Sequence, residues 1–312
     1  MRKVAVFNDT RPMRHFGCDA VMAAIDDNVA ARGGTIILRH PVGRSWDGDA
    51  EALAAIAESD LVLINGEATM HRDLPVAVRW SRLGPHCASL GKPCYLINAT
   101  VQNVKGQVRE NLAAFTGISV RDNRSASELH GFGMAAEMTG DLTYFHDLPH
   151  HRPTEARGLV LDSADKRHDM GAIAAALRLD YVAMRYSNRG LKAYRKRFLR
   201  RQFETGKPSG RIPGVTTFQK FAAYLAARPF VVTGRFHGLC FAINGGIPFA
   251  AMSLSSWKVD AMLDDIGLGR DRLYQPGQVP QPLEPGELDL MAHYKTDVQQ
   301  RISAMFDRIL PS

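Results

Sequence analysis

The sequence has few cysteines and no long hydrophobic run. Its four cysteines, Cys18, Cys87, Cys94 and Cys240, are scattered without a close CxxC pair, which argues against a zinc site or a disulfide scaffold. No stretch approaches the roughly 18 apolar residues that a membrane-spanning helix needs. The start, MRKVAVFNDT, lacks the apolar core of a signal peptide. We therefore expect a reduced, cytoplasmic protein.

Two common phosphate-binding motifs are also missing. The chain contains neither GxGxxG nor GxxxxGKS, so it carries no dinucleotide fingerprint and no Walker loop. The composition, with 45% hydrophobic and 23% charged residues, is that of an ordinary globular protein. A length of 312 residues indicates two domains.

Positive charge is concentrated in one segment. The chain carries a net charge of +7, whereas residues 185–211 alone hold ten Lys and Arg against one Glu, a net +9. Within 189–201 the cations surround an apolar face, which suits an anionic membrane surface or the pyrophosphate of a lipid-linked sugar, and equally a solvated helix face. No nucleic-acid recognition motif accompanies these cations, so we expect no nucleic-acid partner.

Apolar, strand-like runs alternate with helical patterns along most of the chain. This βαβα order, with strands apolar on both faces, predicts an α/β fold with parallel sheets covered by helices. The order breaks at residues 144–158, YFHDLPHHRPTEARG, where we place a linker. The sequence thus predicts two Rossmann-like domains, 1–147 and 155–312, with a closing helix at 285–309.

The stretch VVTGRFHGLCFAINGG predicts a strand, a sharp turn and a helix. Ligands of parallel sheets collect at the carboxyl ends of strands, and helix N-termini attract anions. Arg235 can bind a carboxylate or phosphate through two hydrogen bonds, Gly238 can admit an anion to the backbone, and His237 can donate a proton. A structural ion pair for Arg235 and a core position for His237 are the alternatives.

Two earlier turns carry further polar residues. HFGCDAV follows the first strand, and its Asp19 is either a binding residue or the N-cap of a helix. LINGEATMHRD follows the third strand and contains Asn65, Gly66, Glu67 and His71. The spacings in this loop are not diagnostic of metal ligands, so we expect a substrate loop and no metal.

The turn SVRDNRSASEL ends another predicted strand. Arg121 could bind an anion, and an ion pair with the neighbouring Asp122 is the alternative. Ser125 is expected at the N-cap of the following helix.

The order of these turns, with NATVQ at 98–102, GD at 140–141 and GRFHGLCFAINGGIPFAAMSLSSWKVDAML, resembles the polysaccharide pyruvyl transferase family. The resemblance covers most of the chain, although residues 186–215 are not matched. It implies two Rossmann-like domains in a glycosyltransferase B-like arrangement with a central cleft. It also implies transfer of a pyruvyl group from phosphoenolpyruvate to two hydroxyls of a sugar as a cyclic ketal.

The resemblance assigns roles to residues as well. Arg235 and His237 match the motif for donor binding and acid catalysis, Lys258 is its downstream lysine, and Arg121 and Asp19 occupy positions lining the cleft. The first loop reads FGCD where many members have glycine directly before aspartate. Phosphoenolpyruvate is a co-substrate, and no cofactor is implied.

We expect Gly238 and Arg121 on the donor side with Arg235 and Lys258, and Asp19 with Asn65, Gly66, Glu67 and His71 on the acceptor side. The expected partners are phosphoenolpyruvate, a glycan or lipid-linked glycan acceptor, and an anionic membrane at 189–201, which would put the protein at the inner membrane face. A nucleotide-sugar-dependent glycosyltransferase and a noncatalytic glycan- or anion-binding protein are the alternatives, because fold alone does not choose.

Overall fold

The structure, a computed structural model, describes residues 1–67, 69–186, 212 and 214–311. The basic segment 189–201 lies outside these residues. The chain forms two compact units: Met1–Met13, Val21–Phe145 and Thr296–Ser312 make unit 1, and Arg14–Ala20 with His146–Lys295 make unit 2. The residues of two helices are therefore divided between the units.

Unit 1 contains a six-stranded parallel sheet in the order β2-β1-β3-β4-β5-β6. Its central strands are apolar on both faces, and Val4, Val6, Leu63 and Ile97 are fully buried. In chain order the elements are β1 (Lys3–Asp9), η1 (Arg11–Met13), α1 (Phe16–Ala31), β2 (Thr35–Pro41), α2 (Ala50–Glu58), β3 (Leu61–Asn65), α3 (Pro75–Ser81), α4 (Leu83–Ser89), β4 (Cys94–Ala99), α5 (Gly106–Leu112), β5 (Gly117–Val120), α6 (Asn123–Gly131), β6 (Glu137–Met138) and η2 (Leu142–Phe145).

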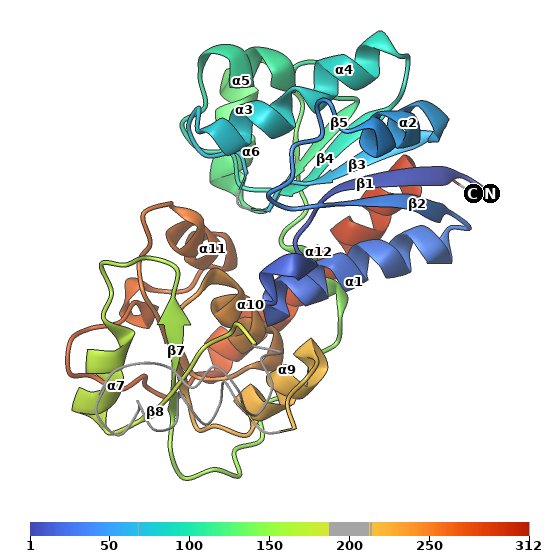
Figure 1. Ribbon diagram of the computed structural model, residues 1–312. Coiled ribbons are helices and arrows are strands. Elements are labelled where there is room, and N and C mark those ends of the chain that lie inside the picture. The colour runs from blue at the N-terminus through green and yellow to red at the C-terminus, as the bar shows by residue number, and fades with distance from the viewer. Residues whose placement is uncertain (68, 187–211, 213, 312) are drawn as a thin grey trace, which may run out of the picture. The chain divides into compact units, whose positions relative to one another are not determined.

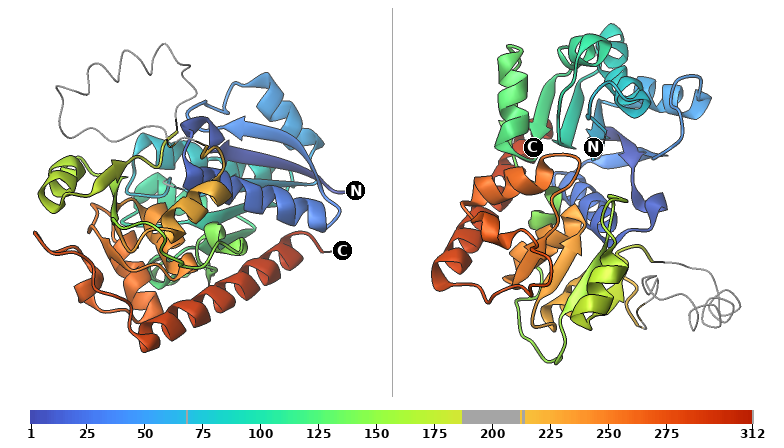
Figure 2. Two further views of the ribbon diagram at one scale, coloured as in Figure 1. Left: turned by 90° about the horizontal axis from the view of Figure 1, so that it is seen from below. Right: turned by 90° about the vertical axis from the view of Figure 1, so that its left-hand side faces the viewer.

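Helices cover both faces of this sheet (Figure 1). On one face α2 to α6 bury a core that includes Trp80, Leu83 and Leu129. The other face receives the Val21–Ala31 part of α1 and the unit 1 part of α12 (Pro285–Ile309), where Arg32 lies over the Phe306 ring. The sequence predicted the bounds of α12 correctly, and the left view of Figure 2 shows it as one unbroken helix.

Unit 2 contains a four-stranded parallel sheet in the order β10-β9-β7-β8. The helix α7 packs on one face, and α9 and α10 lie on the other (Figure 1). The described elements are β7 (Leu159–Ser163), α7 (Met170–Leu177), β8 (Asp180–Val182), α9 (Phe218–Ala226), β9 (Val231–Gly234), α10 (Phe236–Gly245), β10 (Phe249–Ala251), α11 (Lys258–Ile266), η3 (Arg270–Arg272) and the first part of α12.

The structure confirms the predicted α/β class with parallel sheets and corrects several local expectations. The sequence pattern near residues 74–90 predicts one helix, whereas the structure has two, α3 and α4, which meet at Arg82. Pro85 explains the break, because it has no N–H to continue the helical hydrogen bonds. None of the described helices combines the length and the apolar character that a membrane span requires.

Candidate functional site

The carboxyl ends of β7 and β9 meet at the centre of the unit 2 sheet. The chain leaves β7 toward β8 on one side, while β9 lies on the other, so this is the point where strand order reverses and where ligands of open α/β sheets bind. Gly234 ends β9 directly beside Ser163, and a Cβ on Gly234 would lie 2.4 Å from the Ser163 Cβ. Only glycine allows the two strand ends to approach this closely.

Arg235 follows Gly234 and is the N-cap residue of α10. Its Nε donates a hydrogen bond to Asp162 Oδ2 at 3.0 Å, and its Nη2 also contacts that oxygen. The other oxygen, Asp162 Oδ1, accepts from the Met184 backbone N–H at 3.0 Å. Because both side chains are mostly buried, with 16% and 12% exposed, the ion pair holds the guanidinium in a fixed position.

His237 is the second residue of α10 and is 6% exposed. Its ring centroid lies 5.5 Å from that of His15, just before α1. Between them Gly17 is essential for packing, because a Cβ there would come within 2.3 Å of the His237 Cβ and Cγ. The first turn of α1 therefore presses against the first turn of α10.

Asp19 lies in the first turn of α1, which begins at Phe16, so the N-cap alternative is wrong. Unit 2, and not the first domain, contains this residue. A short backbone pairing holds the start of α1 there: the Phe16 N–H donates to Met184 O, and the Tyr186 N–H to Arg14 O. Burial, together with the Asp19 carboxylate, raises the pKa of Tyr186 to about 12.

Gly238 lies in the first turn of α10, and Lys258 contacts the first residue of that helix. Lys258 begins α11, and its Nζ is 5.5 Å from the ring centroid of Phe236, a cation–π contact. A Cβ on Gly238 would lie 2.3 Å from Thr233 Oγ1 and 2.9 Å from Leu161 Cδ1. Gly238 thus lets the start of α10 pack against the sheet, a role that the sequence did not indicate.

Unit 1 has a second group of polar residues, at the carboxyl ends of β1 and β3. Glu67 is 7% exposed, and its Oε2 accepts hydrogen bonds from Thr10 Oγ1 at 2.9 Å and Asn65 Nδ2 at 3.4 Å. Asn8 Nδ2 donates to the Asn65 carbonyl at 2.6 Å. Gly66 packs on β4, since its Cβ would lie 2.5 Å from the Ala99 Cβ. The structure thus joins Asn65 and Glu67 in one buried network.

His71 and Arg121 are the other two predicted residues of unit 1. His71 is half-buried and forms a backbone bridge with Gln102. Arg121 is 3% exposed, and its Nε contacts Asp141 Oδ2 at 2.9 Å and Asn98 Oδ1 at 3.1 Å.

One expectation around α6 needs correction. Asp122, and not Ser125, is the N-cap residue of α6, and it accepts a hydrogen bond from the Ser125 N–H at 2.8 Å. Arg121 forms an ion pair with Asp141, and the ion pair with Asp122 stays a prediction. The predicted N-cap, Ser125, lies inside the helix, where its hydroxyl accepts from the Val101 N–H at 3.0 Å. An aspartate directly before the first helical residue competes well with serine for the N-cap position.

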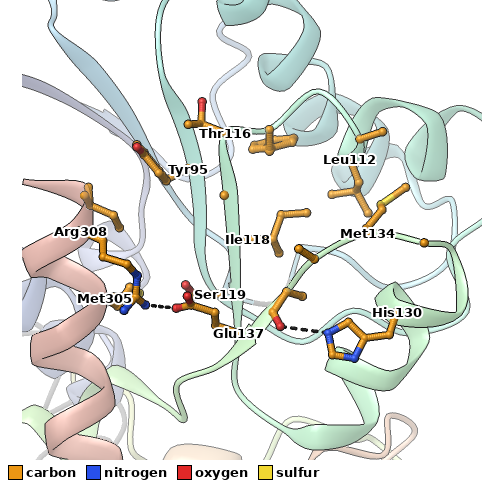
Figure 3. Close-up of a pocket in the computed structure, with 17 residues that line it drawn as sticks. Tyr95, Leu112, Thr116, Ile118, Ser119, His130, Met134, Glu137, Met305 and Arg308 are labelled. Carbon is orange, nitrogen blue, oxygen red and sulfur yellow. Dashed lines mark hydrogen bonds and ion pairs between the residues drawn. The ribbon is translucent and has the colours of Figure 1, made fainter.

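A hollow of about 600 Å³ lies elsewhere on unit 1 (Figure 3). It is bordered by Tyr95 and Gly117, near the amino ends of β4 and β5, and by the ion pair between Arg308 and Glu137. Its lining contains none of the ten predicted site residues, all of which the structure describes. It therefore lies at the opposite ends of the strands from the ligand-binding edge.

The comparisons with known proteins bear on both the fold and the family. A putative UDP-N-acetylglucosamine 2-epimerase from Listeria monocytogenes superposes with a TM-score of 0.53 at 11% identity, covering 97% of this chain and 90% of that one. At this identity the likeness shows the fold alone. No curated protein matches the chain significantly.

Two further structures resemble the chain with TM-scores below 0.5. A functionally uncharacterized protein from Klebsiella pneumoniae has a TM-score of 0.48 at 13% identity, covering 89% of this chain and 92% of its own. AviGT4, a glycosyltransferase involved in avilamycin A biosynthesis, has 0.47 at 14% identity, covering 99% and 96%.

The family is shown by a different comparison. The family model described as polysaccharide pyruvyl transferase matches residues 15–256, well over half of the chain. The match includes Arg235 and His237 and ends before Lys258. The chain belongs to the polysaccharide pyruvyl transferase family.

Proposed function

We propose that this protein transfers a pyruvyl group from phosphoenolpyruvate to two hydroxyls of one sugar, in a cell-surface polysaccharide or its lipid-linked precursor. The family match supports transferase chemistry on a glycan. The observation that carries the proposal is the position of Arg235 and His237, at the start of α10 beside the point where strand order reverses. Phosphoenolpyruvate is the co-substrate, and the mechanism uses no cofactor.

The start of α10 suits a doubly anionic donor. The helix N-terminus offers backbone N–H groups and a partial positive charge, and the side chains of Arg235 and Lys258 add cationic groups nearby. Asp162 binds one edge of the Arg235 guanidinium, at Nε and Nη2. We propose that Asp162 orients Arg235, so that Nη1 faces the donor.

In the proposed reaction, protonated His237 donates its proton to the methylene carbon of phosphoenolpyruvate. The adjacent carbon becomes an oxocarbenium-like electrophile, and one sugar hydroxyl adds to it with loss of its own proton. A second hydroxyl then displaces inorganic phosphate and closes the cyclic ketal. One diol and one phosphoenolpyruvate therefore yield one ketal and one phosphate.

The acceptor roles are proposed for Asp19, Asn65, Gly66, Glu67 and His71. Glu67 and Asn65 offer carboxylate and amide groups of the kind that hydrogen-bond sugar hydroxyls. The donor contact expected of Arg121, and the central cleft, stay predictions. The binding of a membrane by 189–201, and with it a place at the inner membrane face, concerns residues outside the described part of the chain.

The test is phosphate release from phosphoenolpyruvate. The purified chain is incubated with phosphoenolpyruvate and a panel of glycosides that present paired hydroxyls, and products are analysed by mass spectrometry. Phosphate release with a pyruvyl ketal on a sugar is the expected result. Sugar transfer from a nucleotide sugar without use of phosphoenolpyruvate would favour a glycosyltransferase instead. Binding of phosphoenolpyruvate or glycan without turnover of either donor would favour a binding protein.

A further inference from the structure

Three side chains of the types that bind metal ions in proteins meet inside unit 2. His15, Cys18 and His237 each offer a ligand atom, and these atoms all lie within 4.8 Å of one another. All three residues are buried, with exposed fractions of 4%, 2% and 6%. Among the described residues, these three form the group of His, Cys, Asp or Glu side chains that lie close enough together to hold one metal ion.

The local chain path brings the three together. His15 and Cys18 are three residues apart at the start of α1, so their side chains share one face of that turn. The bridge between His15 and Arg185 fixes this turn in unit 2, and the absent side chain of Gly17 lets His237 approach it. The cluster thus combines two segments more than 200 positions apart in the chain.

We propose that His15, Cys18 and His237 bind a zinc-type divalent ion. Two imidazole nitrogens and one thiolate match the nitrogen and sulfur ligands that Zn²⁺ prefers, and three protein ligands leave a fourth position for water or another ligand. Mg²⁺ and Ca²⁺ prefer oxygen ligands and are not expected here. Cys18 must lose its thiol proton to solvent when the ion binds, so binding should strengthen as the pH rises.

Binding requires one small rearrangement. His15 Nδ1 accepts a hydrogen bond from the Gly17 backbone N–H at 3.1 Å. A metal bound at Nδ1 takes the place of this hydrogen bond. A metal bound at Nε2 leaves the ring proton on Nδ1, which then can no longer accept the hydrogen bond from Gly17. One neutral hydrogen bond is therefore exchanged for metal–ligand bonds.

The site has a regulatory consequence that rests on the proposed function. A metal on the imidazole of His237 occupies a nitrogen lone pair that proton transfer would use. The metal-loaded protein should therefore be the inactive form, and removal of the metal should activate it.

Co²⁺ tests the binding separately from catalysis. The metal-free full-length chain is titrated with Co²⁺, and thiolate coordination is followed through its near-ultraviolet charge-transfer absorption. We expect one equivalent of Co²⁺ to bind with this band and to be displaced by Zn²⁺. Cys18→Ser should abolish the band, and His15→Ala should weaken Zn²⁺ binding at least ~100-fold, since even outer contacts of a metal are worth 10- to 100-fold.

The matched control is Cys94→Ser, which changes a buried thiol of unit 1. It should leave the Co²⁺ band intact, and circular dichroism checks that each metal-free variant is folded. The proposal is overturned if the wild type shows no thiolate band, or if the band survives in folded Cys18→Ser or disappears in folded Cys94→Ser. These outcomes do not depend on whether phosphoenolpyruvate is a substrate.

Discussion

Arg235 and Asp162 form an ion pair that joins the carboxyl ends of β9 and β7. The two residues are 73 positions apart, and Asp162 also accepts a backbone hydrogen bond from Met184. The structural alternative considered for Arg235 therefore describes a real contact. It does not exclude donor binding, because a carboxylate that binds Nε and Nη2 also orients the guanidinium.

Arg235→Ala, alone and combined with Asp162→Ala, separates the structural role of Arg235 from its proposed role in donor binding. The single variant leaves a mostly buried carboxylate without its partner, so we expect a loss on the order of 3 kcal/mol in the free energy of unfolding. The double variant removes both charges and should recover much of that loss. Denaturant unfolding measures stability, and calorimetry measures phosphoenolpyruvate binding. If Arg235 binds the donor, affinity stays low in both variants; recovery of affinity together with stability would leave Arg235 a purely structural role.

His237→Ala should lower the rate of pyruvyl transfer. A positioned general acid contributes roughly 10²- to 10⁴-fold, and we expect a loss of kcat in that range. The measurement is phosphate release with metal-free enzyme. The KM for phosphoenolpyruvate should change little, because Arg235, Lys258 and the start of α10 remain. Near-normal turnover by a folded His237→Ala variant would remove this residue from the mechanism.

Gly17→Ala should disturb His237 without removing it. The new Cβ would lie 2.3 Å from the His237 Cβ and Cγ, so the ring or the first turn of α1 must move. Forced contacts of this kind typically cost about 1–3 kcal/mol of stability. We expect kcat for phosphate release to fall as well, because proton donation requires accurate placement.

Gly286→Ala is the matched control for Gly17→Ala. Gly286 also lies at the start of a helix in unit 2, α12, and a Cβ there meets nothing within 4 Å. Its stability and kcat should be close to those of the wild type. Equal kcat values in Gly17→Ala and Gly286→Ala would show that the contact between α1 and His237 has no part in the reaction.

The sequence predicted the elements of the fold better than the contacts of the site. Apolar runs that alternate with helical patterns indicated β7, β9 and the turn at Arg235, because strand and helix patterns are local signals. Asp162, the partner of Arg235, and Asp141, the partner of Arg121, could not be recognised from local patterns. Ion pairs between residues at strand ends depend on the order of the strands in the sheet. His15 and Cys18 were missed as neighbours of His237 for the same reason.

The expectation about Asp19 shows the same limit. Residues 14–20 were assigned to the first domain by their place in the chain. The pairing of Arg14–Phe16 with Met184–Tyr186 instead makes them part of unit 2. This strand-like pairing leaves no periodic pattern in the sequence, so the sequence alone could not assign Asp19 to unit 2.

Glu287→Gln should destabilise the protein in a pH-dependent way. Arg272 is 4% exposed and donates from Nε to Glu287 Oε1 at 2.7 Å, and hydrogen bonding to this guanidinium lowers the pKa of Glu287 from its ordinary value of 4.5. A lowered folded-state pKa means that the stabilisation is present above about pH 4.5 and is lost as the pH falls through the folded-state value.

At pH 7 the substitution should cost on the order of 3 kcal/mol, because it leaves the buried Arg272 without its charged partner. The difference from the wild type should shrink as the pH falls from about 4.5 through the lowered folded-state pKa of Glu287, where the native carboxyl also takes up a proton. Urea unfolding at several pH values measures both effects. Glu58→Gln is the control, since the pair of Lys3 with Glu58 is exposed and should contribute little. A cost for Glu287→Gln that does not change between pH 7 and acid would show that packing, and not the ion pair, accounts for the stabilisation.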